Sequence, residues 1–152
     1  MLPAGLARYP LKVPDLLIAT DSAAVYDDVR AAVEDVDVAI RWAREGRAVL
    51  PALQERPADL VVTDLQIGSM GGYAIAMDLA LETGAGRLGV TPVLMLLDRR
   101  ADVFLARRTA VAGWLLKPLD PMRTRAAVGA ILGGRHYYDD TFTPRPVAVL
   151  PA

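Results

Sequence analysis

The chain has 152 residues with 17 basic and 18 acidic side chains, so its formal net charge is −1. This length fits one domain, and the 53% share of apolar residues supplies one buried core and excludes global disorder. The balanced charge gives no reason to expect nucleic acid or an anionic membrane as a partner. Cysteine is absent, which excludes disulfides, thiolate metal sites and thiol catalysis. His136 is the only histidine, so neither a histidine-pair metal site nor a Ser-His-Asp triad within this chain is expected.

Targeting and membrane signals are not evident in the sequence. The apolar runs are shorter than the roughly 20 residues that span a membrane. Residues 1–14 lack the charged start and apolar stretch of a signal peptide. We therefore expect a soluble, cytoplasmic protein with no membrane partner. Lysine is rare here, because Lys12 and Lys117 are the only two among the 17 basic residues.

Apolar strands and amphipathic helices alternate along the chain. Strands are expected at 15–20, 36–42, 59–63, 92–97 and 112–116. Helices are expected at 22–33, from 46 onward, at 73–82, at 100–109 and at 121–132. In the first helix, Val25, Val29 and Val33 recur at the spacing of one helical face. The last helix has Asp120 at the N-cap position and Pro121 directly after it, where the missing N–H costs nothing.

This alternation predicts an α/β fold. Near-continuous apolar strands separated by helices indicate a parallel sheet covered on both faces. Right-handed crossovers then favour a (βα)5 doubly wound, flavodoxin-like sheet with strand order 2-1-3-4-5. We divide the chain into an irregular N-terminal lead (1–13), this domain (14–134) and a C-terminal extension (135–152). The extension is aromatic and apolar, so we expect it to dock on its own domain or on a partner.

Charged residues follow the strands of this predicted sheet. Asp21 comes after the first strand, Asp64 after the third, Asp98 after the fourth and Lys117 after the fifth. In the expected order, two carboxylates and one ammonium share a small space at the sheet edge where binding sites form. A carboxylate can attack a phosphoryl group and hold it as an acyl phosphate. Mg²⁺ on carboxylate and carbonyl oxygens, together with a lysine, would supply the positive charge this reaction needs.

At this point the sequence resembles a known family, the receiver domains of two-component response regulators, over about residues 14–134. The segments that carry the resemblance are LLIATD at 16–21, ADLVVTDLQIGSMGG at 58–72, TPVLMLLD at 91–98 and GWLLKPLDP at 113–121. The resemblance implies a phosphoprotein that serves as a signalling switch rather than a classical enzyme. Asp64 matches the residue that becomes an aspartyl phosphate, and Lys117, in the Lys-Pro dipeptide, matches the lysine that binds the phosphoryl group.

The resemblance also implies a magnesium site and a switch. Asp21 matches the second of two acidic metal ligands, and Gln66 matches the residue whose backbone carbonyl binds the metal. Trp114 occupies the place of an aromatic side chain that moves on activation. The Lys117-Pro118 bond is commonly cis in the family. The implied partners are a histidine kinase or phosphotransfer protein and a downstream protein target, reached through the last two helices, the fifth strand and Trp114; a homodimer is possible.

Four positions depart from the family pattern. Thr20 replaces the first acid of the metal-binding pair, and Gly68 replaces a proline. Leu97 replaces the hydroxyl residue that links the phosphoryl group to the fourth strand, and Asp98 replaces a small residue. The lost carboxylate predicts weaker binding of a divalent ion. Leu97 cannot donate a hydrogen bond, so a switch built on Trp114 needs another trigger. Asp98 would either restore charge at the metal site or repel the phosphoryl group.

Two functions therefore follow from the sequence. The first is a stand-alone response regulator of a phosphorelay, phosphorylated on Asp64 and acting through protein contacts. The alternative is a pseudo-receiver, an interaction module that is not phosphorylated. A flavodoxin-like small-ligand domain is a third option, supported only by the glycine loop at 68–72. The GxGxxG pattern at 84–89 follows a helix instead of opening one, so we interpret it as a crossover loop rather than a nucleotide site.

Overall fold

The computed structural model describes residues 12–141. Its centre is a six-stranded, all-parallel sheet in the order β2-β1-β3-β4-β5-β6. The strands are β1 (Asp15–Ala19), β2 (Ala39–Ala43), β3 (Leu60–Asp64), β4 (Val93–Leu97), β5 (Gly113–Leu116) and β6 (Tyr137–Tyr138). The predicted fold class and the order 2-1-3-4-5 are confirmed, with β6 as an addition at the outer edge of β5.

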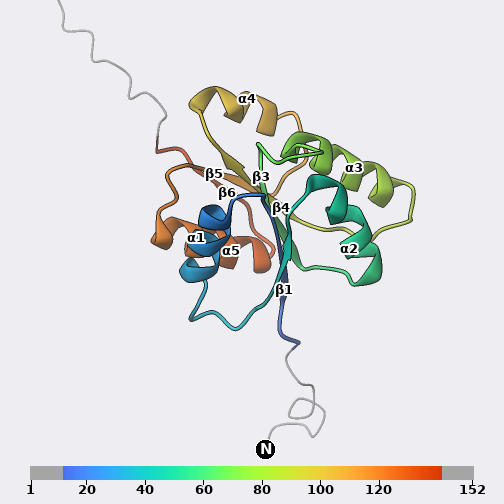
Figure 1. The fold of residues 1–152 in the computed structure, drawn as a ribbon, viewed down its shortest axis with the longest axis horizontal. Helices are drawn as coiled ribbons and strands as arrows, with labels where there is room; N and C mark the ends of the chain where they lie inside the picture. The colour runs from blue at the N-terminus through green and yellow to red at the C-terminus, as the bar shows by residue number, and fades with distance from the viewer. Residues whose placement is uncertain (1–11, 142–152) are drawn as a thin grey trace, which may run out of the picture.

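Five α-helices connect the strands and cover both faces of the sheet (Figure 1). They are α1 (Ala23–Ala32), α2 (Val49–Glu55), α3 (Gly72–Gly84), α4 (Val103–Ala106) and α5 (Pro121–Leu132). Two short 3₁₀ turns, Gly46–Ala48 and Arg100–Asp102, lead into α2 and α4. No helix between residues 12 and 141 combines the length and the apolar character that a membrane crossing requires.

Two apolar layers form because successive strand residues point to opposite faces. On one face, Leu17, Val61 and Met95 pack with residues of α2, α3 and α4. On the other face, Leu16, Ile18 and residues of the neighbouring strands pack against α1 and α5. Strands β1, β3 and β4 are buried along their whole length, as expected for the centre of a parallel sheet.

The largest differences between the observed and the predicted elements are at three places. β2 begins at Ala39 rather than 36, because its partner strand begins at Asp15, which pairs with Ala39. The helix predicted over 100–109 is a 3₁₀ turn followed by a four-residue α4, which ends as the Thr109 hydroxyl donates to the Ala106 carbonyl at 2.8 Å. The sequence prediction misses β6, and the sheet therefore runs past residue 134.

The predicted start of α5 is confirmed in detail. The Asp120 carboxylate accepts a hydrogen bond from the Arg123 amide at 2.9 Å, and Pro121 stands in the first turn. Just before this helix, the Lys117-Pro118 bond is cis. This segment places Lys117 directly after β5, at the edge where the strands end.

Candidate functional site

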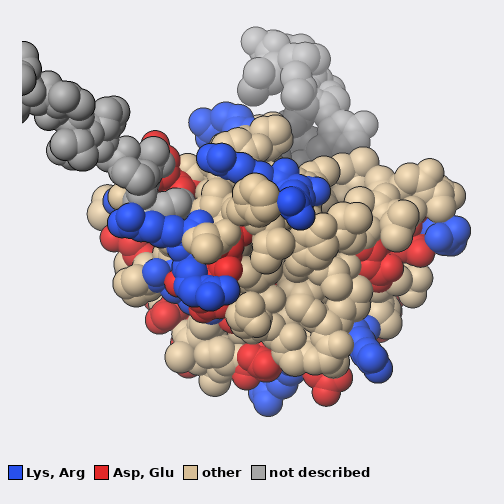
Figure 2. Space-filling model, turned by 90° about the horizontal axis from the view of Figure 1, so that it is seen from above, with Lys and Arg blue, Asp and Glu red and all other residues tan. Residues whose placement is uncertain are grey.

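The carboxyl ends of β1, β3, β4 and β5 bring the predicted residues to one edge of the sheet. Figure 2 views the molecule from above Figure 1, the side on which the strands end, and acidic and basic side chains lie close together on this face. Asp64 is the last residue of β3 and is 2% exposed. Its burial follows from the sheet, because β3 lies between β1 and β4.

Lys117 joins Asp64 to Asp98. The Lys117 Nζ atom donates to Asp64 Oδ1 at 2.7 Å and to Asp98 Oδ1 at 3.0 Å. The Lys117 backbone is held as well, since its N–H donates to the Leu97 carbonyl at 2.9 Å. The two predicted roles of Asp98 were to replace metal-site charge or to repel a phosphoryl group. In this structure its carboxylate competes with Asp64 for the lysine.

The two carboxylates raise the pKa of Lys117. Burial of the side chain lowers this pKa, and the hydrogen bonds with Asp64 and Asp98 and their negative charges more than offset it. Lys117 therefore stays an ammonium across the physiological pH range. A fixed positive charge 2.7 Å from Asp64 is suited to a phosphoryl oxygen bound at that carboxylate.

Thr20 is fully buried beside Asp64. Its hydroxyl donates to Asp64 Oδ2 at 3.2 Å and accepts from the Ser22 amide at 3.1 Å. Where the resemblance implies an acidic metal ligand, this chain thus has a neutral donor that occupies one oxygen of the phosphoacceptor candidate. The Thr20 carbonyl in turn accepts from the Trp42 indole at 2.8 Å, which ties β1 to β2 at the site.

Asp21 and Gln66 lie on the exposed rim of the same edge. Asp21 Oδ2 accepts a hydrogen bond from the Gly68 amide at 2.9 Å, so the departure at 68 brings a backbone donor to the carboxylate. A Cβ at Gly68 would lie 3.3 Å from the same oxygen, which leaves little room for a side chain. Asp21 therefore fastens the loop after β3 to the loop after β1.

The candidate ligands are of the type that binds Mg²⁺, but there are fewer carboxylates than such a site usually has. Carboxylate and carbonyl oxygens are the ligands that Mg²⁺ prefers, and Asp21, Asp64 and the Gln66 carbonyl would supply them. Across residues 12–141, however, no three His, Cys, Asp or Glu side chains form a group that could hold a metal ion. Asp98 faces Lys117 and does not restore the missing ligand. With Thr20 in place of the first acidic residue, Asp21 and Asp64 are the two candidate carboxylate ligands that remain.

The candidate switch residues are both buried. Leu97, at the end of β4, is 0% exposed and belongs to the core between the sheet and α2, α3 and α4. Trp114, in β5, is 7% exposed and pairs with Tyr138 of β6, and the centroids of the two rings lie 4.4 Å apart. The partner surface predicted from the last two helices, the fifth strand and Trp114 is therefore partly covered, because β6 pairs with the outer edge of β5.

Sequence reasoning missed two residues that support the site. Trp42 holds the Thr20 carbonyl, and Asp139 accepts a hydrogen bond from the Leu116 amide, one residue before Lys117. Trp42 is visible in the sequence as an aromatic residue near the end of a predicted strand. Asp139 gives no comparable signal, because it follows the last predicted helix by several residues.

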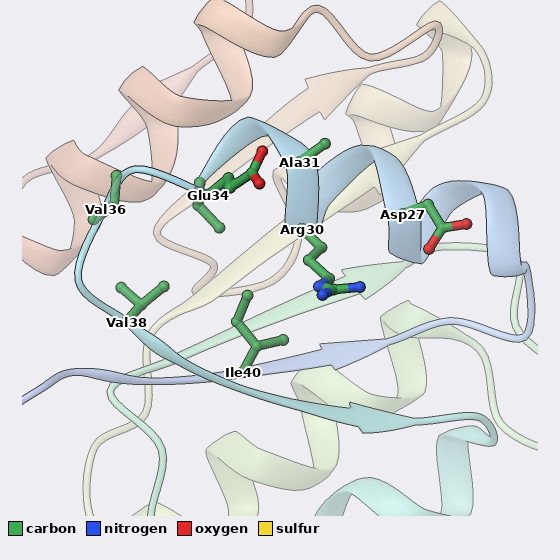
Figure 3. Close-up of a pocket in the computed structure, with 8 residues that line it drawn as sticks. Asp27, Arg30, Ala31, Glu34, Val36, Val38 and Ile40 are labelled. Carbon is green, nitrogen blue, oxygen red and sulfur yellow. The ribbon is translucent and has the colours of Figure 1, made fainter.

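A separate groove lies away from this edge, between α1 and β2. It has a volume of about 450 Å³ and is lined in part by Asp27, Arg30, Glu34, Val38 and Ile40. Arg30 from α1 and Ile40 from β2 extend toward each other across it (Figure 3). None of its lining residues takes part in the Asp64–Lys117 cluster, so we treat it as distinct from the candidate site.

Comparisons with known proteins agree with this arrangement. The model of the response regulator receiver domain matches residues 16–129. The chemotaxis response regulator CheY4 of Vibrio cholerae superposes with a TM-score of 0.69 at 20% identity, over 79% of this chain and 99% of that one. A putative response regulator from Chloroflexus aurantiacus gives 0.72 at 21% identity, over 80% and 99%.

A third similar structure is the signal receiver domain of a histidine kinase from Syntrophus aciditrophicus. Its TM-score is 0.70 at 21% identity, and the alignment covers 91% of this chain and 100% of that one. No curated protein sequence matches the chain. The family model covers most of the residues, so the chain belongs to the response regulator receiver domain family.

Proposed function

We propose that this domain accepts a phosphoryl group on Asp64 and signals through contacts with another protein. The observation that carries the proposal is the buried Asp64 carboxylate held 2.7 Å from the Lys117 ammonium, at the end of a central strand. A donor of the phosphohistidine class, on a histidine kinase or a phosphotransfer protein, would supply the group.

The proposed transfer forms one bond and breaks one. An Asp64 oxygen attacks phosphorus, the bond from phosphorus to the donor's imidazole nitrogen breaks, and that nitrogen keeps the electron pair and takes up a proton. Lys117 then moves its hydrogen bond from Asp64 Oδ1 to a phosphoryl oxygen and neutralises part of the added charge. Mg²⁺, when bound by Asp21, Asp64 and the Gln66 carbonyl, would supply further positive charge.

The outcome of this transfer differs from the usual switch in one respect. Leu97 offers no hydroxyl to a phosphoryl oxygen, so the signal cannot pass to β4 through that contact. Lys117 contacts Asp64 and belongs to the segment directly after β5. We infer that the response to phosphorylation reaches Trp114 through Lys117 and β5. Stand-alone action, a cytoplasmic location and a homodimer stay predictions from the sequence.

Intact-mass measurement tests the proposal. The protein is incubated with acetyl phosphate and Mg²⁺, and we expect a mass increase of one phosphoryl group that Asp64→Asn abolishes. The asparagine variant is a close control, because its side chain has the same shape and keeps an oxygen toward Thr20. A mass increase that persists in Asp64→Asn would contradict the assignment.

A pseudo-receiver is the second candidate, and one observation favours it. The Thr20 hydroxyl occupies Asp64 Oδ2 where the family has an acidic side chain, so the metal site has lost charge. No mass increase from any phosphodonor, together with no change of tryptophan fluorescence at millimolar Mg²⁺, would select this alternative.

A further inference from the structure

The outer edge of β5 is occupied by the chain's own residues. β6 pairs with Gly113 and Trp114 in parallel register, and the amides of Tyr137 and Asp139 donate to the carbonyls of Ala112 (3.0 Å) and Trp114 (3.1 Å). A Cβ at Gly113 would lie 2.1 Å from the Tyr137 carbonyl oxygen. The glycine therefore leaves room for another backbone at this edge.

Side-chain contacts add a specific binding position for an aromatic ring beside Trp114. The rings of Trp114 and Tyr138 lie 4.4 Å apart, tilted by 35°. The Trp114 indole N–H donates to the Asp139 carbonyl at 3.3 Å. The Arg107 guanidinium lies 5.9 Å from the centroid of the Trp114 ring, and Arg107 directly follows α4. The indole is thus both a stacking platform and a hydrogen-bond donor.

Asp139 supplies the anchor of this segment. The residue is 5% exposed, and its carboxylate accepts hydrogen bonds from the Leu116 amide at 3.0 Å and from the Thr141 hydroxyl at 2.7 Å. The Arg123 guanidinium lies 4.0 Å away. These hydrogen bonds and the positive charge lower the pKa of Asp139 despite its burial. The Leu116 amide would have no strand partner without this carboxylate, because β6 ends at Tyr138.

The contacts of residues 137–141 define which kind of segment the outer edge of β5 can bind. A segment that fits must present two backbone N–H donors two residues apart, an aromatic ring between them and a carboxylate that reaches the Leu116 amide beside Arg123. Strand addition of this kind takes affinity from main-chain hydrogen bonds and specificity from alternate side chains. β6 has two residues, so the main-chain hydrogen bonds that hold this occupant at the edge are few.

We propose that the outer edge of β5, with Trp114, is a docking site for an extended partner segment of aromatic–acidic sequence. Residues 137–141 are its internal occupant and compete with the partner. The internal segment is tethered, so its effective concentration is in the millimolar range, and a partner binds only after that segment is released. The hydrogen bond between Asp139 and the Leu116 amide must break when the internal segment is released. Leu116 directly precedes Lys117, which contacts Asp64, so this hydrogen bond lies one residue from the candidate phosphorylation site.

Hydrogen exchange and peptide binding to the full chain test the proposal. In Asp139→Ala we expect the amides of residues 137–141 and Leu116 to exchange at least tenfold faster than in the wild type. Asp140→Ala is the matched control: it removes the same charge one residue later, at an exposed position. We expect it to leave these amides unchanged.

The binding probe is a labelled peptide with the sequence of residues 135–141. We expect this peptide to bind the Asp139→Ala protein at least tenfold more tightly than it binds the wild type. Replacing the peptide's own aspartate, the one that matches Asp139, by alanine should lower the affinity of the peptide at least fivefold. Tyr138→Ala, at a 47% exposed position, is a second variant that leaves the core intact and should also admit the peptide.

Two results would overturn the proposal. Unchanged exchange in Asp139→Ala would show that Asp139 does not anchor the segment. Free exchange of residues 137–141 without binding of the peptide would show that the edge is no docking site. Neither readout involves a phosphodonor, so these failures are distinct from a failure of phosphorylation at Asp64.

Discussion

Asp98 and Asp64 share one ammonium group. The Lys117 Nζ atom lies 2.7 Å from Asp64 and 3.0 Å from Asp98, and the Asp98 side chain is 38% exposed. A phosphoryl group that binds Lys117 would share the ammonium charge with this second carboxylate. The sequence left open whether Asp98 assists or opposes the reaction. From the contact with Lys117 we infer that Asp98 opposes the reaction, and the next experiment tests this.

Asp98→Asn should therefore speed the phosphorylation of Asp64 by acetyl phosphate. An exposed ion pair is worth up to about 1 kcal/mol, which corresponds to about two- to fivefold in rate. The measurement is the initial rate of the mass increase, with Asp140→Asn as a charge-matched control at an exposed position. A slower reaction in Asp98→Asn would show instead that the carboxylate assists, for example by binding the metal.

The site residues show which parts of a site can be predicted from sequence. Asp64 and Lys117 were predictable, because each directly follows an apolar strand and parallel strands end at one edge. The hydrogen bond from Thr20 to Asp64 could not be predicted, because a threonine at a strand end gives no sign of where its hydroxyl points. The position of Asp98 was open for the same reason: charge is visible in a sequence, but a rotamer is not.

At the scale of elements, the start of α3 lies directly against the end of β3. The Gly72 amide donates to the Leu65 carbonyl at 3.0 Å. A Cβ at Gly72 would lie 2.7 Å from the Asp64 carbonyl oxygen and 3.0 Å from Leu65 Cα. These atoms belong to the backbone and cannot turn away. Glycine at this position therefore lets the helix begin beside the phosphoacceptor candidate.

Gly72→Ala should lower the free energy of unfolding by about 1–3 kcal/mol, the usual cost of forcing atoms into a packed site. Gly84→Ala, at the other end of the same helix, is the control, because its Cβ would meet no atom within 4 Å. That variant should not be destabilised, since alanine is the better helix former. Chemical denaturation measures both, and equal stability of the two variants would contradict the close approach.

The end of a helix or strand can be predicted where a local sequence signal marks it. It cannot be predicted where pairing with another strand sets it. The α5 start was readable from Asp120 and Pro121, because an N-cap and a first-turn proline act within one turn. The start of β2 depends on where β1 begins, and β6 depends on an edge of β5 far away in the sequence. Two tyrosines after a helix carry no signal that such an edge is free.

At the scale of the whole molecule, the order of the sheet produces the site. Alternating strands and helices with right-handed crossovers left few arrangements, and the one found places β1 and β3 side by side with β4 and β5 next to them. Asp64 and Lys117 are 53 residues apart in the chain and meet because of this order. Asp21 joins the same edge through Gly68.

The identity of the phosphorylated atom tests the account most directly. After incubation with acetyl phosphate, borohydride reduces an aspartyl phosphate to homoserine, and peptide mass spectrometry then locates the reduced residue. We predict homoserine at position 64 and at no other aspartate. Homoserine at Asp21 or Asp98, or none at all in protein whose mass has increased, would contradict the assignment of Asp64 as the acceptor.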